Sequence, residues 1–515
     1  MSEHKKLFRS AGVVSFFTLL SRILGFLRDI IIAGLFGTGT AAEAFVVAFR
    51  IPNTLRHLIG EGATNAAVIP ILSEYLETDN KEEFWRVAHI LLNLLVVILV
   101  LISIAGIIFA PGIVRIIAFG FGEDAAKLAL TIKLTRVMFS FIFFIGLTAY
   151  LMGVLNTLKH FAAPAASSCF LNISMIFFGL CLCGRFKEPV VGMAIAVLIG
   201  GFLQFIVQVP ILMKKGFRLI FPLRFYHPAI KRITGLLLPR IVGSSIYQIN
   251  IFIDTMFASL GSIVGQGAVA VLYFAHHLVQ FPTALFGTAM ATASLPTMSR
   301  QAIANDLDSL KKTLEMSLRT MLILLIPSTV GLFVLARPII RALFEHGKFD
   351  AASTNITSLV LMSYCVGLFA YSGARVTTSC FYALRDTVTP VKITFGCLVI
   401  NIIFNVMLMF PLKACGLALA TSISSSVNFF LLIAALRAKI GALGLRSLVV
   451  YSGRIIIASA FMGAACLLGY YFFFRLFKST ALSLSAAIIC GMLTYLLSGW
   501  RLGIFKGLRW RYGTA

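Results

Sequence analysis

Long apolar runs separated by short polar connectors extend along almost the whole chain, and this pattern indicates the fold class. An α-helix needs about 18 or more mostly apolar residues to cross a bilayer. Fourteen runs of about this length lie at 10–36, 39–63, 87–110, 128–156, 163–183, 189–212, 233–260, 268–296, 316–336, 354–376, 390–411, 413–436, 451–474 and 480–500. No polar stretch between them is long enough to form a soluble domain. The pattern therefore predicts an all-α integral membrane protein with fourteen transmembrane helices.

Composition and charge agree with this prediction. The chain is 59% hydrophobic and only 12% charged, whereas soluble domains carry about 25% charged residues. The formal net charge of +25 comes from 44 basic and 19 acidic residues. The basic residues are spread over connectors and do not form one basic face on a soluble module, which argues against nucleic acid as a partner.

The distribution of Lys and Arg predicts the orientation in the membrane. If the N-terminus is cytoplasmic, the inside connectors hold 26 basic residues and the outside connectors hold 10. The positive-inside rule then places both termini in the cytoplasm. The basic N-terminus followed by an apolar stretch resembles a signal peptide, but no small-residue cleavage site follows, so we expect a retained first helix.

The chain also repeats itself at long range. Residues recur at a constant offset of 226 in the pairs Pro70 and Pro296, Ser73 and Ser299, Arg115 and Arg341, Leu158 and Leu384, and Pro164 and Pro390. We interpret this as two pseudo-symmetric six-helix bundles in parallel orientation, at 1–215 and 216–440, followed by two C-terminal helices and a tail at 441–515. Carriers built from such repeats bind their cargo near the midplane, between the two copies.

Residues 21–62 depart from the apolar pattern. They have the apolar density of two membrane helices, yet their charged and titratable residues are Arg22, Arg28, Asp29, Glu43, Arg50, Arg56, His57 and Glu61. One charge at the centre of a lipid-facing helix costs about 2.5–3.5 kcal/mol, so these side chains should face one another or a water-filled cavity. Because guanidinium groups bind phosphate in a bidentate way and outnumber the acids here, the stretch predicts an anion site.

Simpler interpretations of the same residues stay open. Arg22 or Arg28 could pair with Asp29 or Glu43 as a structural intramembrane ion pair. Arg28 lies about 120° from Arg22 on an ideal helix, so both reach one cavity only if the helix bends near Gly25. Arg50 could bind the anion or anchor its helix at the interface. His57 and Glu61, four residues apart, could form a local gate pair.

A second polar group lies far along the chain. Asp254 stands in an otherwise apolar run, Asn401 and Asn405 are four residues apart in another, and Thr421 follows in the next. Oxygen ligands of this kind suit a hard cation such as Na⁺. A hydrogen-bonded cluster that holds three helices together explains them equally well.

Several segments together resemble the MurJ (MviN) lipid II flippases, within the multidrug/oligosaccharidyl-lipid/polysaccharide exporter superfamily. They are SRxLGFxRD at 21–29, AFRIPNTLRHLxGEGA at 48–63, VIPILS at 68–73, YFAHHLVQFPxxLFGTA in the eighth apolar run, and FYALRDTxTPVK at 381–392. The resemblance covers essentially the full length. It implies a flippase of the bacterial inner membrane that moves undecaprenyl-pyrophosphate-linked peptidoglycan precursor from the inner to the outer leaflet by alternating access. It also implies a monomeric transporter, not an enzyme, that works in cell wall biogenesis beside the cell-wall synthesis machinery.

By its motifs, the resemblance assigns the cavity cations to Arg22, Arg28 and Arg56 and the cavity acids to Asp29, Glu43 and Glu61. It also allows the monovalent-cation site suggested above. One departure stands out: the family pattern A-D-R-L-x-E-F-P is replaced by AHHLVQFP at 275–282. We therefore expect a lopsided anion site, with permanent charge on the first two helices and a titratable His277, beside His276, in the second bundle.

The alternatives are a related exporter of another lipid-linked oligosaccharide and a multidrug/cation antiporter. An arginine-rich cavity argues against cationic drugs as cargo. A membrane enzyme would need clustered acids for a metal or for catalysis, and no interior run carries them. No phosphate-binding G-x-x-x-x-G-K-[ST] motif is present, so we expect ion or voltage gradients to supply the energy.

Overall fold

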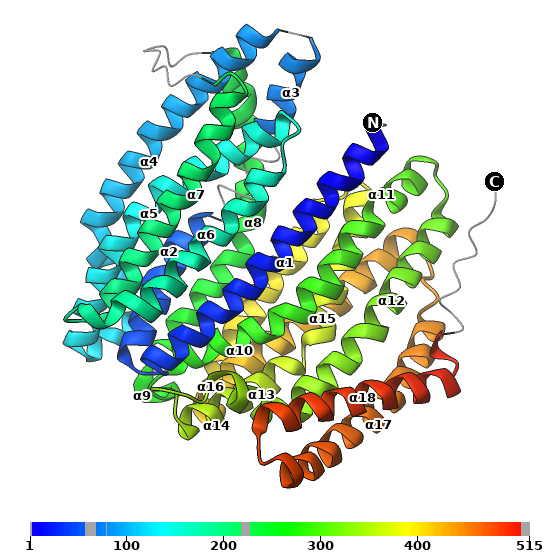
Figure 1. The fold of residues 1–515 in the computed structure, drawn as a ribbon. Coiled ribbons are helices and arrows are strands. Elements are labelled where there is room, and N and C mark those ends of the chain that lie inside the picture. The colour runs from blue at the N-terminus through cyan, green and yellow to red at the C-terminus, as the bar shows by residue number, and fades with distance from the viewer. Residues whose placement is uncertain (1–2, 57–67, 79, 218–226, 506–515) are drawn as a thin grey trace. The chain divides into compact units, whose positions relative to one another are not determined.

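The computed structural model describes residues 3–56, 68–78, 80–217 and 227–505, and the regular structure in these ranges is helical (Figure 1). Among these residues, nine helices are long and apolar enough to cross a membrane. The number becomes ten if α14 (Ala351–Cys365) and α15 (Leu368–Ala383), which meet at a bend of 41°, are counted as one span. The prediction of an all-α, multi-pass membrane protein is confirmed.

The chain divides into two compact units, Met1–Gly261 and Ser262–Ala515. The helices of the first unit are α1 (Glu3–Phe36), α2 (Thr40–Arg56), α3 (Ile69–Glu77), α4 (Lys81–Ile117), α5 (Ala125–Thr157), α6 (Ala162–Phe177), α7 (Pro189–Lys214) and α8 (Pro228–Ala258), with the short segments η2 (Phe119–Glu123), η3 (Phe178–Leu182) and η4 (Cys183–Arg185). The short α9 (Gly261–Val264) crosses the boundary between the units.

Helix α5 is the centre of the first unit. It packs against α2, α4 and α7, while α1 packs against α6 and α8 packs against α4. Small residues allow these close approaches: a Cβ on Gly146 would lie 2.6 Å from the Leu99 side chain, and one on Gly201 would lie 2.5 Å from Phe141. The helices begin where side chains can cap them, as when Asp124 accepts a hydrogen bond from the backbone N–H of Lys127.

The second unit contains α10 (Ala268–Pro282), η5 (Thr283–Thr288), α11 (Ala289–Ile303), α12 (Leu307–Val334), α13 (Ala336–Phe344), α14, α15, α16 (Val388–Ile440), α17 (Leu445–Phe477) and α18 (Thr480–Arg501). Helices α17 and α18 pack against each other, and α17 packs on α12. Their exposed faces are apolar, with Phe461 60% and Leu468 72% exposed, as expected of surfaces that face lipid.

Two helical stretches of the second unit depart from regular α-helical geometry. Lys413 inside α16 has non-helical backbone angles (φ 52°, ψ −134°). The 53 residues of α16 would span about 80 Å as one straight helix, far more than the ~30 Å hydrocarbon core. The break falls where the sequence separates the runs 390–411 and 413–436. In the other helix, α10, η5 and α11 follow one another without a connector, and η5 is a π-helix.

Candidate functional site

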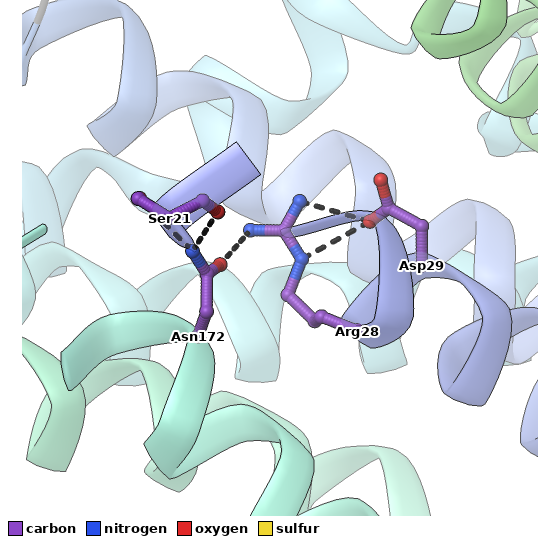
Figure 2. Close-up of polar contacts among 4 residues, drawn as sticks. All are labelled: Ser21, Arg28, Asp29 and Asn172. Atoms are coloured by element: carbon purple, nitrogen blue, oxygen red, sulfur yellow. Dashed lines mark hydrogen bonds and ion pairs between the residues drawn. The ribbon is translucent and has the colours of Figure 1, made fainter. Parts of the chain in front are cut away.

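Arg28 lies at the centre of a buried polar cluster between α1 and α6 (Figure 2). The residue is 9% exposed. Its Nε and Nη2 donate to Asp29 Oδ1 at 3.0 and 2.8 Å, and its Nη1 donates to Asn172 Oδ1 at 3.1 Å. Asn172 in turn donates to the backbone carbonyl of Ser21 at 3.1 Å. Two side chains, Asp29 from α1 and Asn172 from α6, therefore hold the guanidinium in one position.

Arg22 is on a different face of the same helix. It is exposed where Arg28 and Asp29 are buried, and α1 continues unbroken from Glu3 to Phe36. A Cβ on Gly25 would lie 3.7 Å from Asn172, an ordinary contact, so close packing does not require glycine there. Helix α1 has no break at Gly25, and Arg22 and Arg28 lie on different faces of it, so the structure does not bring the two arginines to one point.

Side-chain hydrogen bonds join α2 to α8 within the first unit. Arg50 Nη1 donates to Thr255 Oγ1 and, at 3.4 Å, to the carbonyl of Ile251. One turn further, Thr54 Oγ1 donates to Gln248 Oε1 at 3.3 Å. Arg50 and Thr54 are four residues apart and therefore lie on the same face of α2, so both can reach α8.

Arg56 is the last residue of α2, where its Nε donates to Asn53 Oδ1 at 3.1 Å. His57 and Glu61, the expected gate pair, lie outside the described residues.

Glu43 has a buried partner that the sequence analysis missed. It forms an ion pair with Lys127 of α5, and the two side chains are only 3% and 5% exposed. The Lys127 ammonium also lies 4.0 Å from the centre of the Phe121 ring. Lys127 lies just before the predicted run 128–156, and so among the connector residues, but in the structure it belongs to the first turn of α5. The spacing of Lys127, Thr131 and Thr135 could have indicated that this lysine belongs to a helix, because it places three polar residues on one helical face. All three are buried in the structure.

The two histidines of α10 are half-buried and lie against tyrosines. The ring centres of His277 and Tyr273 are 4.2 Å apart, and those of His276 and Tyr364 are 5.5 Å apart. Aromatic contacts of this kind orient the imidazoles of the second unit.

The residues expected to bind a cation fall into two groups. In the second unit, Asn405 Nδ2 donates to Asn401 Oδ1 at 2.9 Å, and Asn401 Nδ2 donates to Thr421 Oγ1 at 3.4 Å. Asp254 belongs to the first unit, where Asn250 Nδ2 donates to its carboxylate at 3.3 Å. The donor set is oxygen-based, as Na⁺ prefers, and three of its four members lie together. Over the described part of the chain, no group of three or more His, Cys, Asp or Glu side chains could hold a metal ion.

These features define a class of protein: a multi-pass helical membrane protein with a buried, hydrogen-bonded arginine in its first unit. The fold resembles that of a solved lipid II flippase MurJ in an inward closed conformation, with a TM-score of 0.79 and 26% identity over 96% of this chain and 99% of that one. It also resembles an inward-facing multidrug resistance transporter of the MATE family and MOP superfamily, with a TM-score of 0.72 and 17% identity over 84% of this chain and 98% of that one. At that identity the second likeness concerns the fold alone.

Sequence comparison narrows the class to one family. A family model described as lipid II flippase MurJ matches residues 32–503. The lipid II flippase MurJ of Burkholderia cenocepacia is 36% identical over 437 residues, which cover 84% of each chain. The probable lipid II flippase MurJ of Vibrio cholerae is 33% identical over 471 residues, covering 90% of this chain and 89% of that one. The chain belongs to the MurJ lipid II flippase family, whose members are transporters and not enzymes.

Proposed function

We propose that this protein moves lipid II, the undecaprenyl-pyrophosphate-linked peptidoglycan precursor, from the inner to the outer leaflet of the bacterial cytoplasmic membrane by alternating access. The observation that carries the proposal is the family match over residues 32–503, with relatives that are 33–36% identical over most of the chain.

The proposed architecture has fourteen spans. Two six-helix bundles occupy 1–215 and 216–440, the last two helices with the tail occupy 441–515, and both termini are cytoplasmic. The constant offset of 226 residues and the excess of basic residues in alternate connectors support this arrangement. The protein works as a monomer, beside the enzymes that consume its cargo.

In the proposed mechanism, the pyrophosphate of lipid II meets arginines of the first unit. Arg28 is the best prepared of them, because Asp29 and Asn172 already orient its guanidinium. Arg22, Arg50 and Arg56 add positive charge, and His277 adds a titratable group from the second unit. The polyprenyl chain stays in lipid while the headgroup crosses.

The proposed roles of the acids differ. Asp29 positions Arg28, and Glu61 contributes to a gate. Glu43 is neutralised by Lys127, so it does not offset the arginines. The balance of charge in this region therefore favours an anionic cargo more than the sequence alone indicates.

We also propose that a monovalent cation such as Na⁺ binds to Asp254, Asn401, Asn405 and Thr421. A bound cation would supply a fixed positive charge coupled to the ion gradient. Asn401 Oδ1 and Thr421 Oγ1, which accept hydrogen bonds from the amide groups of Asn405 and Asn401, would bind the ion instead. Transport that is equally fast in Na⁺ and K⁺, in the wild type and in Asp254→Ala alike, would remove this part of the proposal.

The experiment that tests the flippase function is complementation of a MurJ-depleted bacterium, combined with an assay of lipid II accessibility in each leaflet. The wild type should restore growth and flipping, and Arg28→Ala should not. Arg86→Ala is the matched control, because Arg86 is exposed and pairs with Glu83 at the start of α4. Normal flipping by an expressed and inserted Arg28→Ala protein would refute the role of Arg28, and failure of the wild type would refute the function.

A further inference from the structure

Helix α15 carries an arginine that the family motifs do not single out. Arg375 lies in the interior of this helix, seven residues after its start at Leu368 and eight before its end at Ala383. The residue is exposed, and its Nη1 donates a hydrogen bond to Thr288 Oγ1 at the end of η5. An interior arginine of a membrane helix is costly unless it meets water or an anion.

The surroundings of Arg375 on α15 are polar. From position 371 to 383, the residues that are not buried are Tyr371, Arg375, Thr378 and Tyr382. Their spacing of four, three and four places them on one face, and every one of them bears a polar group. The lipid-facing surfaces of α17 and α18 show the opposite composition, with exposed Phe461 and Leu468. The exposed face of α15 is therefore a surface for water or a polar ligand.

Close packing fixes Arg375 beside Thr288. A Cβ on Gly287 would lie 2.4 Å from Ser372 Oγ and 3.1 Å from its Cα, so α15 and η5 touch at this point. Arg375 follows Ser372 by about one turn, and Thr288 follows Gly287 directly. The π-helix η5 ends at Thr288, and the hydroxyl of this residue accepts the hydrogen bond from Arg375.

No acid balances this arginine on the helices that surround it. The sequences of α10, η5, α11, α14, α15 and α16 contain no Asp or Glu. Helix α12, which packs against α15, carries Asp308 and Glu315. Asp308 lies 3.7 Å from the Lys311 ammonium, and Glu315 accepts from Arg319 at 2.7 Å and from Ser447. The span from Ala268 to Pro296 contains no Lys or Arg either, so Arg375 is the permanent cation of this polar surface.

We propose that Arg375 is an anion-binding residue of the second unit and that it contacts the pyrophosphate of the lipid-linked cargo. The inference rests on the proposed function and extends it, because it gives the second unit a permanent charge where α10 has only histidines. A guanidinium binds phosphate oxygens through two parallel N–H groups, and a neutral hydroxyl such as that of Thr288 is easily exchanged for an anion. Arg375 thus supplies the charge that an anion meets on this side of the carrier.

The test measures ligand affinity with the full-length protein in lipid nanodiscs. The ligands are lipid II, undecaprenyl pyrophosphate, undecaprenol and inorganic pyrophosphate. Arg375→Ala should weaken the first two by about 10-fold or more and leave undecaprenol unchanged. Arg375→Gln, which keeps a donor for Thr288 but removes the charge, should behave in the same way. Arg375→Lys should lose less affinity, because it keeps the positive charge but lacks the planar guanidinium that binds phosphate through two N–H groups.

The control is Arg454→Ala, which removes an exposed arginine from α17 and should change none of these affinities. Wild-type affinity of the Ala and Gln variants for both lipid pyrophosphates would overturn the inference, as would an equal loss for undecaprenol. If only inorganic pyrophosphate depends on Arg375, the site takes free anions and the lipid headgroup assignment is wrong.

The same proteins separate this inference from the function on which it rests. If the wild type flips lipid II and the Arg375 variants bind normally, only the inference fails. If the wild type does not flip lipid II but binds undecaprenyl pyrophosphate through Arg375, the proposed function fails and the anion site stands.

Discussion

The buried pair of Glu43 and Lys127 gives the sharpest prediction about stability. Its side chains are 3% and 5% exposed, so neither charge can be hydrated when its partner is removed. Loss of one partner from a buried ion pair costs about 3–5 kcal/mol. Lys127→Met also removes the cation from the Phe121 ring, a contact with the ammonium 4.0 Å from the ring centre. We therefore expect Lys127→Met to lower the free energy of unfolding by about 3–5 kcal/mol.

The same helix provides a matched control. Lys133 forms an ion pair with Glu188 at 2.6 Å, but these side chains are 55% and 48% exposed. Exposed pairs contribute about 0–1 kcal/mol, so Lys133→Met should change stability by no more than this. The contrast between two lysines of α5 isolates the effect of burial from that of charge.

A double-mutant cycle completes the test. Glu43→Gln combined with Lys127→Met removes both charges and should be within about 1 kcal/mol of the wild type, or more stable. The coupling energy should then be at least about 3 kcal/mol. The assay is denaturant unfolding in mixed micelles, with the thermal midpoint as a second measure. A Lys127→Met protein as stable as Lys133→Met, or a double variant no more stable than the weaker single one, would refute the reasoning.

Two further predictions concern turns outside the long spans. Gly120→Ala should destabilise the first unit by about 1–3 kcal/mol, because its Cβ would lie 2.3 Å from the backbone carbonyl of Ser259; Gly122→Ala, whose Cβ would meet nothing within 4 Å, should be neutral in the same thermal unfolding assay. The Lys439 ammonium lowers the pKa of Asp386 to about 2, so the folded state binds this proton more weakly than the unfolded state. The resulting stabilisation is present above about pH 4 and is lost as the pH falls toward 2. Asp386→Asn should therefore be less stable than the wild type at pH 7. Equal stability of the two proteins at pH 7 would contradict a stabilising role for the Asp386–Lys439 ion pair.

The sequence pattern predicted the fold class because bilayers restrict it strongly. Spans must be helical and long enough to cross the hydrocarbon, so apolar length is informative on its own. The break at Lys413 likewise falls at the first residue of the predicted run 413–436, where it adjoins the run 390–411. Residue-level prediction also succeeded in part, because Arg28 and Asp29 do form the ion pair that was considered as a structural alternative.

Contacts between helices were less predictable. Lys127 lies one residue before the run that begins at 128, so it was counted as a connector, and its partner Glu43 is 84 positions away. Asn172, which holds Arg28, is 144 positions away. Arg375 lies inside a predicted run and was not singled out. In each case the rotation of one helix against another decides the contact, and apolar length carries no information about that rotation.

The hydrogen bonds that hold Arg28 to Asp29 and Asn172 affect how readily a cargo could leave as well as how it binds. Ordering a long side chain at an interface costs about 0.5–1.5 kcal/mol. For Arg28 that ordering has already occurred, since Asp29 and Asn172 fix its rotamer. When an anion departs, the guanidinium returns to contacts that are already in place and leaves no buried charge unsolvated. Such a residue exchanges partners at little cost in either direction, and this reversibility is what a carrier needs at the point of release.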